Sequence, residues 1–356
     1  MTGSAPDHGC DTQNLKGDAE TPKIREIALR LAPQIKAYGA DTKRSWLQLI
    51  STAVPFFVLL GTMVAVTETA YWLTLLLAPI TAGLLVRLFI IQHDCGHGAF
   101  FKTRKANDAI GNMISVFTLT PYEHWRRGHT YHHASSGNLD RRGQGDVETR
   151  TVAEYEAMTP LGRLGYRIYR SPVAQIFVGA AINFIILQRL PLGRGFRDST
   201  SRRSIMMLNL ALVFVFGIPM ALIGVKPVIA AYLPMMWIAA IIGGWLFYVQ
   251  HQFDGTYWRK GDDWNFHEAS LDGSTFFDLP PILQWFTGNI GMHHIHHLCS
   301  TIPNYRLQEC MDTYPELRET AKRIDLRESI KCWSLSLWDE EHGQLISFRD
   351  LEAQRA

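Results

Sequence analysis

Cysteine is scarce in this sequence and shows no pattern typical of metal–sulfur chemistry. The five cysteines are odd in number and include no C-x-x-C pair, so no disulfide framework, zinc finger or iron–sulfur cluster is indicated. No G-x-G-x-x-G segment is present to open a nucleotide-binding fold. The net charge of +2 is too small to indicate binding to nucleic acid. The sequence therefore carries no visible redox carrier and no visible nucleic-acid interface.

Charge is almost absent from four long stretches of the chain. These stretches are residues 46–66, 71–91, 205–225 and 227–249. Each is long enough to cross a hydrocarbon core about 30 Å thick as a helix. Short turns join the first stretch to the second and the third to the fourth, so each pair returns the chain to its starting side. We therefore predict an all-α integral membrane protein with four transmembrane helices in two hairpins.

Lysine and arginine gather on one side of the predicted spans, whereas the opposite turns offer only Lys226. The basic residues on the first side are Lys43, Arg44, Lys102, Arg104, Lys105, Arg197, Arg202 and Arg203. Short loops rich in lysine and arginine stay in the cytosol, so both termini are predicted to be cytosolic. The same asymmetry argues against the alternative of a soluble protein with four buried apolar helices.

The distribution of polar residues divides the chain into three regions. Residues 1–42 are predicted to form a cytosolic arm, in which the apolar spacing of residues 24–35 predicts a short interfacial helix. Residues 43–305 form the membrane domain, and residues 306–356 form a cytosolic tail. Within the membrane domain, residues 109–119 and 172–187 are apolar but interrupted, which is typical of interfacial or partly re-entrant segments.

Histidine is concentrated near the cytosolic ends of these spans, in three clusters. The clusters are His93 and His97; His129, His132 and His133; and His293, His296 and His297. The second and third share the pattern H-x-x-H-H, which in a helix places three imidazoles on one face, close enough to bind one metal ion or to bridge two. Neutral imidazole is a common ligand of zinc, copper, iron and nickel. The clusters therefore predict a metal centre at the cytosolic membrane surface.

Three segments around these clusters resemble the histidine boxes of the membrane fatty acid desaturases. They read H-D-C-G-H-G-A-F-F (residues 93–101), W-R-R-G-H-T-Y-H-H (125–133) and G-N-I-G-M-H-H-I-H-H-L (288–298). Their order and separations are similar to those of the family. The connecting segments at residues 136–149 and 248–253 resemble those of bacterial acyl-lipid desaturases of the delta-5 and omega-6 type. The resemblance covers about residues 84–305 and leaves both ends of the chain unmatched.

The resemblance implies two iron ions in a shell of histidines, with dioxygen as co-substrate and an acyl chain in a bent tunnel. The eight box histidines and His251, which follows the fourth span, take the places of the nine family ligands. In the animal acyl-CoA branch, an asparagine four residues before the ninth histidine contributes through water. Phe247 stands at that position here, and Asn289, four residues before His293, is a candidate substitute.

Several residues near the expected ligands are candidates to orient them. Asp94, Asp140, Asp146 and Asp254 could accept hydrogen bonds from imidazole N–H groups. A cap or turn role is at least as open for Asp140 and Asp146, which lie in a glycine-rich loop. Asn289 belongs to this set through its position before the third box. Arg87 lies in an apolar run, where a charge is usually functional unless it reaches the interface. The neighbouring histidines His124 and His294 are predicted to face away from the metals.

The resemblance implies an oxygen-dependent desaturase that inserts a cis double bond into the acyl chain of a membrane lipid. Hydroxylation or ketolation of a lipid or carotenoid stays open, because the same oxidant would serve it. A non-enzymatic metal-binding membrane protein is a further alternative, but transport predicts ligands near the bilayer midplane.

Each turnover of such an enzyme needs two electrons from outside the chain. A separate carrier, a ferredoxin or flavodoxin with its reductase, is therefore expected to dock on the basic cytosolic face. The predicted location is the bacterial inner (cytoplasmic) membrane, with the metal site on its cytosolic side.

Overall fold

The structure is a computed structural model that describes residues 17–143, 145–193 and 197–355, with side chains from residue 23 onward in the first helix. His8 and Cys10, in the predicted N-terminal arm, lie outside the described residues. The described chain is mainly helical, which confirms the predicted class, and it also contains two small β-sheets that the prediction of an all-α protein omitted.

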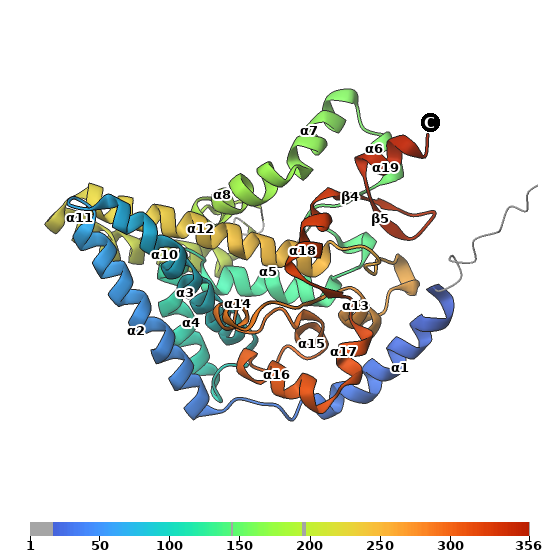
Figure 1. Ribbon diagram of the computed structural model, residues 1–356, viewed down its shortest axis with the longest axis horizontal. Coiled ribbons are helices and arrows are strands. Elements are labelled where there is room, and N and C mark those ends of the chain that lie inside the picture. The colour runs from blue at the N-terminus through green and yellow to red at the C-terminus, as the bar shows by residue number, and fades with distance from the viewer. Residues whose placement is uncertain (1–16, 144, 194–196, 356) are drawn as a thin grey trace, which may run out of the picture.

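Four helices are long and apolar enough to cross a membrane, as the sequence predicts. They are α2 (Thr42–Val66), α3 (Tyr71–His97), α10 with its continuation α11 (Ser199–Val215 and Gly217–Ile223) and α12 (Val225–His251). A turn at residues 67–70 joins α2 to α3, and Gly224 alone separates α11 from α12, so the four spans form two hairpins. Both connections lie at the left end of the bundle in Figure 1.

Local sequence sets the ends of these helices. The Asp41 carboxylate accepts a 3.0 Å hydrogen bond from the Arg44 N–H and begins α2. At the other end of the hairpin, Gly98 adopts a left-handed conformation with φ of 72°, which ends α3 directly after His97. Consequently His93 and His97 both lie in the last turns of α3.

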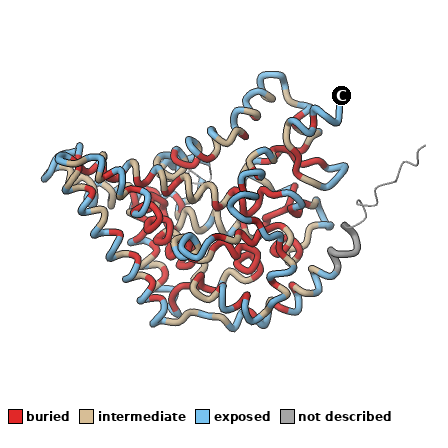
Figure 2. The backbone as a smooth tube through the Cα atoms, in the orientation of Figure 1, coloured by how far each residue is buried: buried red, intermediate tan, exposed pale blue. Residues whose placement is uncertain are grey.

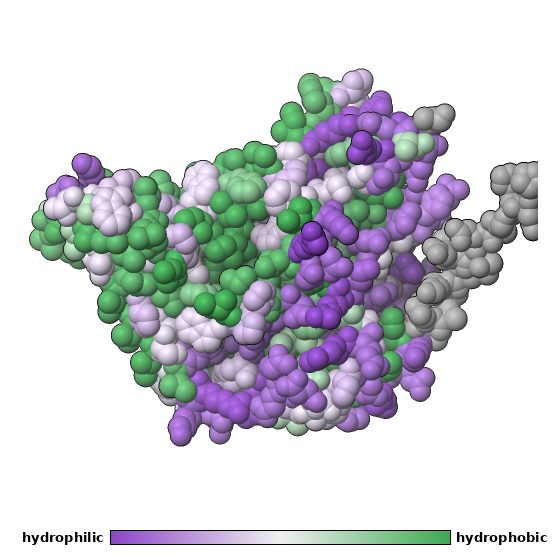
Figure 3. Space-filling model, in the orientation of Figure 1, coloured by the Kyte–Doolittle hydropathy of each residue, from purple (hydrophilic) through white to green (hydrophobic). Residues whose placement is uncertain are grey.

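Helix α3 is the central helix of the bundle and packs against α2, α4 (Arg104–Thr118) and α12. It is buried almost continuously toward its C-terminal end, and buried segments, drawn in red, fill the interior of the molecule in Figure 2. The outer helices instead expose apolar side chains: Leu47, Val213 and Leu222 are 67%, 64% and 78% exposed. The left half of the surface in Figure 3, where the outer helices lie in Figure 1, is mainly green. Such a surface fits contact with lipid rather than water.

A polar cap covers the end of the bundle where α3 and α12 finish (Figure 1). Besides α4 it comprises α5 (Tyr122–Ser135), α13 (Phe266–Asp272), α14 (Pro281–Phe286), α15 (His293–Leu298), α16 (Asn304–Thr313) and α17 (Glu316–Thr320). Helix α1 (Gly17–Ile35) packs on α13 and fully buries Ala28, Leu31 and Ile35 in the cap core. The helix expected at residues 24–35 is therefore longer than predicted and has a protein partner.

The apolar segment before the third span is broken. Helix α7 (Pro160–Arg170) is bent by 57° from a following segment made of the π-helix η2 (Val173–Gly179), α8 (Ala180–Ile185) and the 3-10 helix η3 (Leu187–Arg189). By length and apolar composition the bent pair has the character of a broken span or a re-entrant segment, in agreement with the interrupted pattern of residues 172–187. Close packing of α8 on α12 requires Gly244, where an added Cβ would lie 2.7 Å from that of Ala180.

The C-terminal residues pair with a segment that follows the second histidine box. Strands β1 (Arg150–Thr151), β4 (Leu335–Asp339) and β5 (Gln344–Ser347) form one sheet in that order, with β1 parallel and β5 antiparallel to β4. Strands β2 (Phe276–Phe277) and β3 (Arg323–Ile324) form a parallel pair. The remaining short elements are η1 (Leu139–Arg141), α6 (Val152–Glu156), η4 (Gly261–Asp263), α18 (Leu326–Ser329), η5 (Ile330–Ser334) and α19 (Phe348–Ala353).

Candidate metal centre

Nine histidines from four helices meet where the bundle joins the cap. Within the described residues they form two groups, in each of which the candidate ligand nitrogens all lie within 4.8 Å of one another. Site 1 consists of His93 and His97 from α3, His129 and His133 from α5, and His296 from α15. Site 2 consists of His132 from α5, His251 from α12, and His293 and His297 from α15. These are the nine positions that the sequence nominates as ligands.

The H-x-x-H-H pattern divides its histidines between the two sites. In α5, His129 and His133 belong to site 1, while His132 belongs to site 2. In α15, the histidines at i and i+4 both belong to site 2, and the histidine at i+3 belongs to site 1. Around a helix, i+4 lies about 40° to one side of residue i, and i+3 lies about 60° to the other. Each pattern therefore serves both sites at once.

The spacing of the ligand atoms matches that of donors around an ion. Six pairs of Nε2 atoms within the sites are separated by 2.9–3.1 Å. With metal–nitrogen bonds of about 2.1 Å, two ligands at right angles lie about 3.0 Å apart and two tetrahedral ligands about 3.4 Å apart. The observed separations would suit neighbouring donors around an ion in each site.

The hydrogen bonds made by the Nδ1 atoms also call for a cation. Nδ1 of His132 contacts the carboxylate of Asp146, and Nδ1 of His251 lies 3.1 Å from the carbonyl oxygen of Gly273. Both oxygens are acceptors, so each Nδ1 carries the proton and each Nε2 presents a lone pair. The two Nε2 atoms nevertheless lie only 3.1 Å apart. A metal ion between them would turn this repulsion into coordination, so the residues fit a bound metal.

Burial favours the neutral form of five candidate ligands in the cap. It lowers their pKa well below the ordinary value, and neighbouring imidazoles act in the same direction. These are His129, His133, His293, His296 and His297. Only a neutral imidazole can donate its lone pair to a metal. The two groups of described residues contain histidine alone, so bound metal ions would keep their full positive charge.

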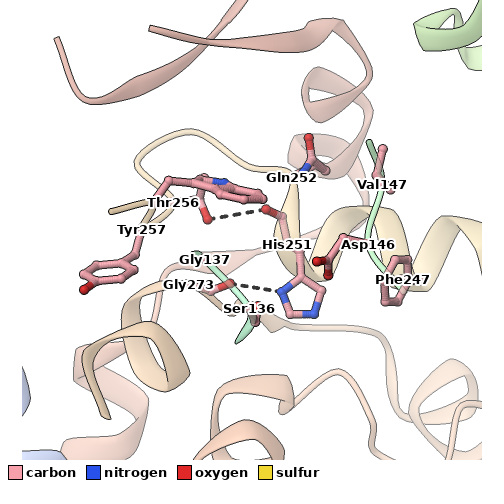
Figure 4. Close-up of a pocket in the computed structure, with 11 residues that line it drawn as sticks. Ser136, Gly137, Asp146, Val147, Phe247, His251, Gln252, Thr256, Tyr257 and Gly273 are labelled. Carbon is pink, nitrogen blue, oxygen red and sulfur yellow. Dashed lines mark hydrogen bonds between the residues drawn. The ribbon is translucent and has the colours of Figure 1, made fainter. Parts of the chain in front are cut away.

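Aromatic side chains fix the orientation of the rings. Trp125 stacks on His129 with ring centroids 4.6 Å apart. Phe247 lies 5.3 Å from the ring of His132 and 5.5 Å from that of His251, on the side of His251 seen in Figure 4. Phe247 occupies the place of the water-binding asparagine of the animal branch and offers no hydrogen bond there. Site 2 therefore has an apolar wall in this chain.

Two of the residues expected to orient ligands do contact them. The Asp94 carboxylate lies 3.0 Å from Nδ1 of His93 through one oxygen. Its other oxygen accepts hydrogen bonds from the backbone N–H and side-chain amide of Asn304, at 2.6 and 2.8 Å. Asp146 contacts Nδ1 of His132. Sequence reasoning missed Asn304. It also missed Gly273, because this residue contacts His251 through its backbone carbonyl and the side chain gives no signal.

The other candidates have different surroundings. Asp140 accepts a 2.8 Å hydrogen bond from the backbone N–H of Gly261. Asp254 is exposed, because the chain leaves helical geometry at residue 252 and turns this side chain away from His251. Asn289 precedes the first turn of α15 in a left-handed conformation, so it is off the ligand face; its amide donates to the Asn304 carbonyl at 3.4 Å. Arg87 bonds to Thr52 and to the backbone of residue 285. Asn289 therefore does not replace the asparagine of the animal branch.

The histidines predicted to face away are outside both groups. His294 is fully buried in the cap, with its ring 6.2 Å from that of Phe276, and burial lowers its pKa to about 4. His124 is partly buried in α5 and belongs to neither site. Cys95 is buried within the helical part of α3, between the two site 1 ligands of that helix, and is likewise in neither group. The face of the helix on which a residue lies therefore decides whether it joins one of the two sites.

Apolar helices of spanning length that end in two all-histidine groups define an integral membrane protein whose histidines could hold metal ions. A profile of the fatty acid desaturase family matches residues 70–328, which include all nine histidines. This match covers well over half of the chain. The chain belongs to the fatty acid desaturase family and is an oxidoreductase.

Curated relatives agree with this assignment. The chain is 39% identical over 324 residues to the fatty acid desaturase of Bacillus subtilis (strain 168), with 91% of each chain covered. It is 28% identical to an sn-1 oleoyl-lipid 12-desaturase of Synechocystis, covering 74% of this chain and 75% of that one. An sn-1 acyl-lipid omega-3 desaturase (ferredoxin) of Synechocystis is 29% identical, covering 63% of this chain and 62% of the relative. The names of the two Synechocystis relatives give different positions for the double bond.

Proposed function

We propose that this chain inserts a double bond into the acyl chain of a membrane lipid, with dioxygen as co-substrate and two iron ions held at sites 1 and 2. The observation that carries the metal assignment is the 3.1 Å approach of the Nε2 lone pairs of His132 and His251. Desaturation is an oxidation and zinc has no redox chemistry, so iron fits the family activity where zinc does not. When bound, the irons supply the one-electron chemistry needed to remove hydrogen from an unactivated methylene.

The chain's own residues position the metals and the lipid. The nine histidines bring their ring nitrogens together where the bundle meets the cap. Asp94, Asp146 and the carbonyl of Gly273 fix which ring nitrogen would face the metal. Burial of the acyl chain contributes about 0.8 kcal/mol per methylene, which binds the chain without fixing its register. The position of the double bond must therefore depend on where the binding path bends or ends.

The fatty acid profile of a bacterial host tests this function. Expression should add an unsaturated fatty acid that gas chromatography with double-bond location identifies, and purified protein should contain about two irons per chain. A hydroxylated or keto product would instead support the alternative chemistry on the same scaffold. Iron-loaded protein of normal abundance that leaves the profile unchanged would contradict the proposal.

We propose that the centre and both termini lie on the cytosolic side of a bacterial inner membrane. Residues 43–305 would form the catalytic membrane domain, flanked by cytosolic segments 1–42 and 306–356. Two contacts support placing the flanks on the same side as the metals: α1 packs on α13, and β4 pairs with β1. The basic residues at this end of the bundle support the cytosolic orientation.

We propose that a soluble, acidic electron carrier docks on the same face; one relative is named for ferredoxin. Arg126 and Arg127 both pair with Glu123, so the exposed Lys102 and Lys105 make the cleaner test. Lys102→Glu with Lys105→Glu should raise the ferredoxin concentration for half-maximal rate several-fold. The rate at subsaturating ferredoxin should fall as salt shortens the Debye length below about 10 Å.

Lys226, an exposed residue beside the turn at the opposite end of the bundle, supplies the control. Lys226→Glu makes the same kind of substitution, at one position instead of two, where no cytosolic carrier can reach it, and ferredoxin dependence should stay as in the parent. Equal effects of the two changes, or a rate insensitive to salt, would show that the basic residues contact lipid head groups only.

A further inference from the structure

A second site lies on the cap, separate from the histidines. It is a cavity of about 570 Å³, within the range of roughly 300–1,000 Å³ typical of small-molecule sites. Its lining includes Arg87 from α3, Trp285 from α14, Arg318 from α17 and Arg323 from β3, with Asp278 as the acidic residue among them. Three arginines against one aspartate make the cavity cationic.

Arg87 is the residue that most requires an explanation. It is only 9% exposed and lies within a membrane-spanning helix. Its Nε donates to Thr52 Oγ1 at 3.2 Å, its Nη1 donates to the carbonyl of Trp285, and its guanidinium stacks 4.2 Å from the Trp285 ring. These groups are neutral, and no carboxylate of the described residues forms an ion pair with Arg87. A buried charge of this kind calls for an anion, and the cavity it lines can hold one.

The other two arginines of the lining are exposed. Arg323 pairs with Asp278, and Arg318 lies 3.5 Å from Asp312. The side chains of Arg318 and Arg323 are 54% and 67% exposed, so both can turn toward a ligand. Guanidinium groups bind phosphate oxygens through paired N–H donors, which lysine cannot reproduce.

Helix α14 places this cavity at the membrane surface. Its Ile282, Leu283 and Trp285 are 67%, 38% and 41% exposed although all three are apolar. In Figure 3, the region that α14 occupies in Figure 1 lies where the green and purple halves meet. Trp285 thus contributes both to an exposed apolar edge and to the wall of a cationic cavity, an arrangement suited to a ligand that is itself part lipid and part anion.

We propose that this cavity binds the phosphate of the glycerophospholipid whose acyl chain is desaturated. This inference rests on the proposed function and adds the head-group class of the substrate. Arg87 would neutralise the phosphate from within, while Arg318 and Arg323 would close over it from the cytosolic side. A phospholipid is favoured over free phosphate because the exposed apolar edge of α14 adjoins the cavity.

Binding is measured first, without turnover. Native mass spectrometry of the purified protein in detergent would titrate dioctanoyl phosphatidylglycerol, dioctanoylglycerol and inorganic phosphate separately. We expect saturable binding of the phospholipid, and Arg318→Gln with Arg323→Gln should weaken it by about tenfold or more, as loss of charged hydrogen bonds predicts. Arg327→Gln, an exposed arginine outside the lining, is the matched control and should bind like the parent. Equal affinity for dioctanoylglycerol, or inorganic phosphate that displaces the lipid at equal concentration, would overturn the proposal.

A second measurement separates charge from folding at Arg87. Arg87→Met removes the charge and Arg87→Lys keeps it, so only the lysine variant should retain a preference for phospholipid over dioctanoylglycerol. The preference for phospholipid over diacylglycerol is then measured from turnover in nanodiscs that contain both classes of lipid. The double variant of Arg318 and Arg323 should lose most of this preference. If the parent protein desaturates both lipids without preference, the head-group site alone is contradicted. If it desaturates neither, the proposed function is contradicted.

Discussion

His133→Ala and His297→Ala should each abolish formation of the unsaturated product while leaving the protein at normal abundance in the membrane. The two residues belong to different sites, and their rings stack across the boundary with centroids 4.1 Å apart. Removing either leaves one metal short of a donor in a buried site, where no carboxylate of either group can substitute. Iron per chain should fall in both variants, and gas chromatography should detect no product.

The matched controls for these two changes are His124→Ala and His294→Ala, which alter histidines outside both groups. Both should keep two irons per chain and the parent's product per molecule. His294 is fully buried in the cap core, so its truncation leaves a cavity and should lower abundance rather than iron content. Product formation by His133→Ala or His297→Ala at parental level would refute the assignment of these residues as ligands.

The spans could be predicted because hydropathy over about 20 residues is a local property of the sequence. The clustering of the candidate ligands in α5 and α15 could be predicted because H-x-x-H-H places three rings on a helix whatever the helix packs against. The division of each pattern between two sites could not be predicted from spacing alone. It depends on α5 and α15 facing each other across the ends of α3 and α12, an arrangement set by packing between segments far apart in the chain.

Nearness in sequence was a poor guide to which residues orient the ligands. Asp94 follows His93 directly and contacts it, whereas Asp254, three residues after His251, is exposed because the helix has ended before it. Asp146 lies 14 residues from His132 and still reaches it, because the loop after α5 folds back over that ring. The strands were missed for a similar reason. A strand of two residues such as β1 has no period of its own, and only its pairing with β4 defines it.

Asp146 should prove nearly as important to activity as a ligand. Its carboxylate is the acceptor that holds the proton of His132 on Nδ1, which leaves Nε2 free to face site 2. Asp146→Ala removes the acceptor, so the ring can rotate or carry its proton on Nε2, and either change removes a donor from site 2. Loss of such an orienting partner typically costs about 10–100-fold in metal affinity or activity. Asp146→Asn keeps one acceptor oxygen, so its metal affinity and activity should lie between those of Asp146→Ala and the parent.

The measurement that isolates this effect is the resistance of bound iron to a chelator, followed at constant protein concentration alongside product yield. In Asp146→Ala, iron equivalent to about half of the total should be lost at chelator concentrations that leave the parent intact, because the ligands of site 1 are unchanged. Asp254→Ala removes an exposed carboxylate near another ligand of the same site and should match the parent in both measurements. If Asp146→Ala instead loses both irons together with its folded abundance, the carboxylate supports the loop after α5 rather than the tautomer of His132. If iron loss decreases from Asp146→Ala to Asp146→Asn to the parent at constant abundance, a single hydrogen bond decides which nitrogen of the His132 ring faces the metal.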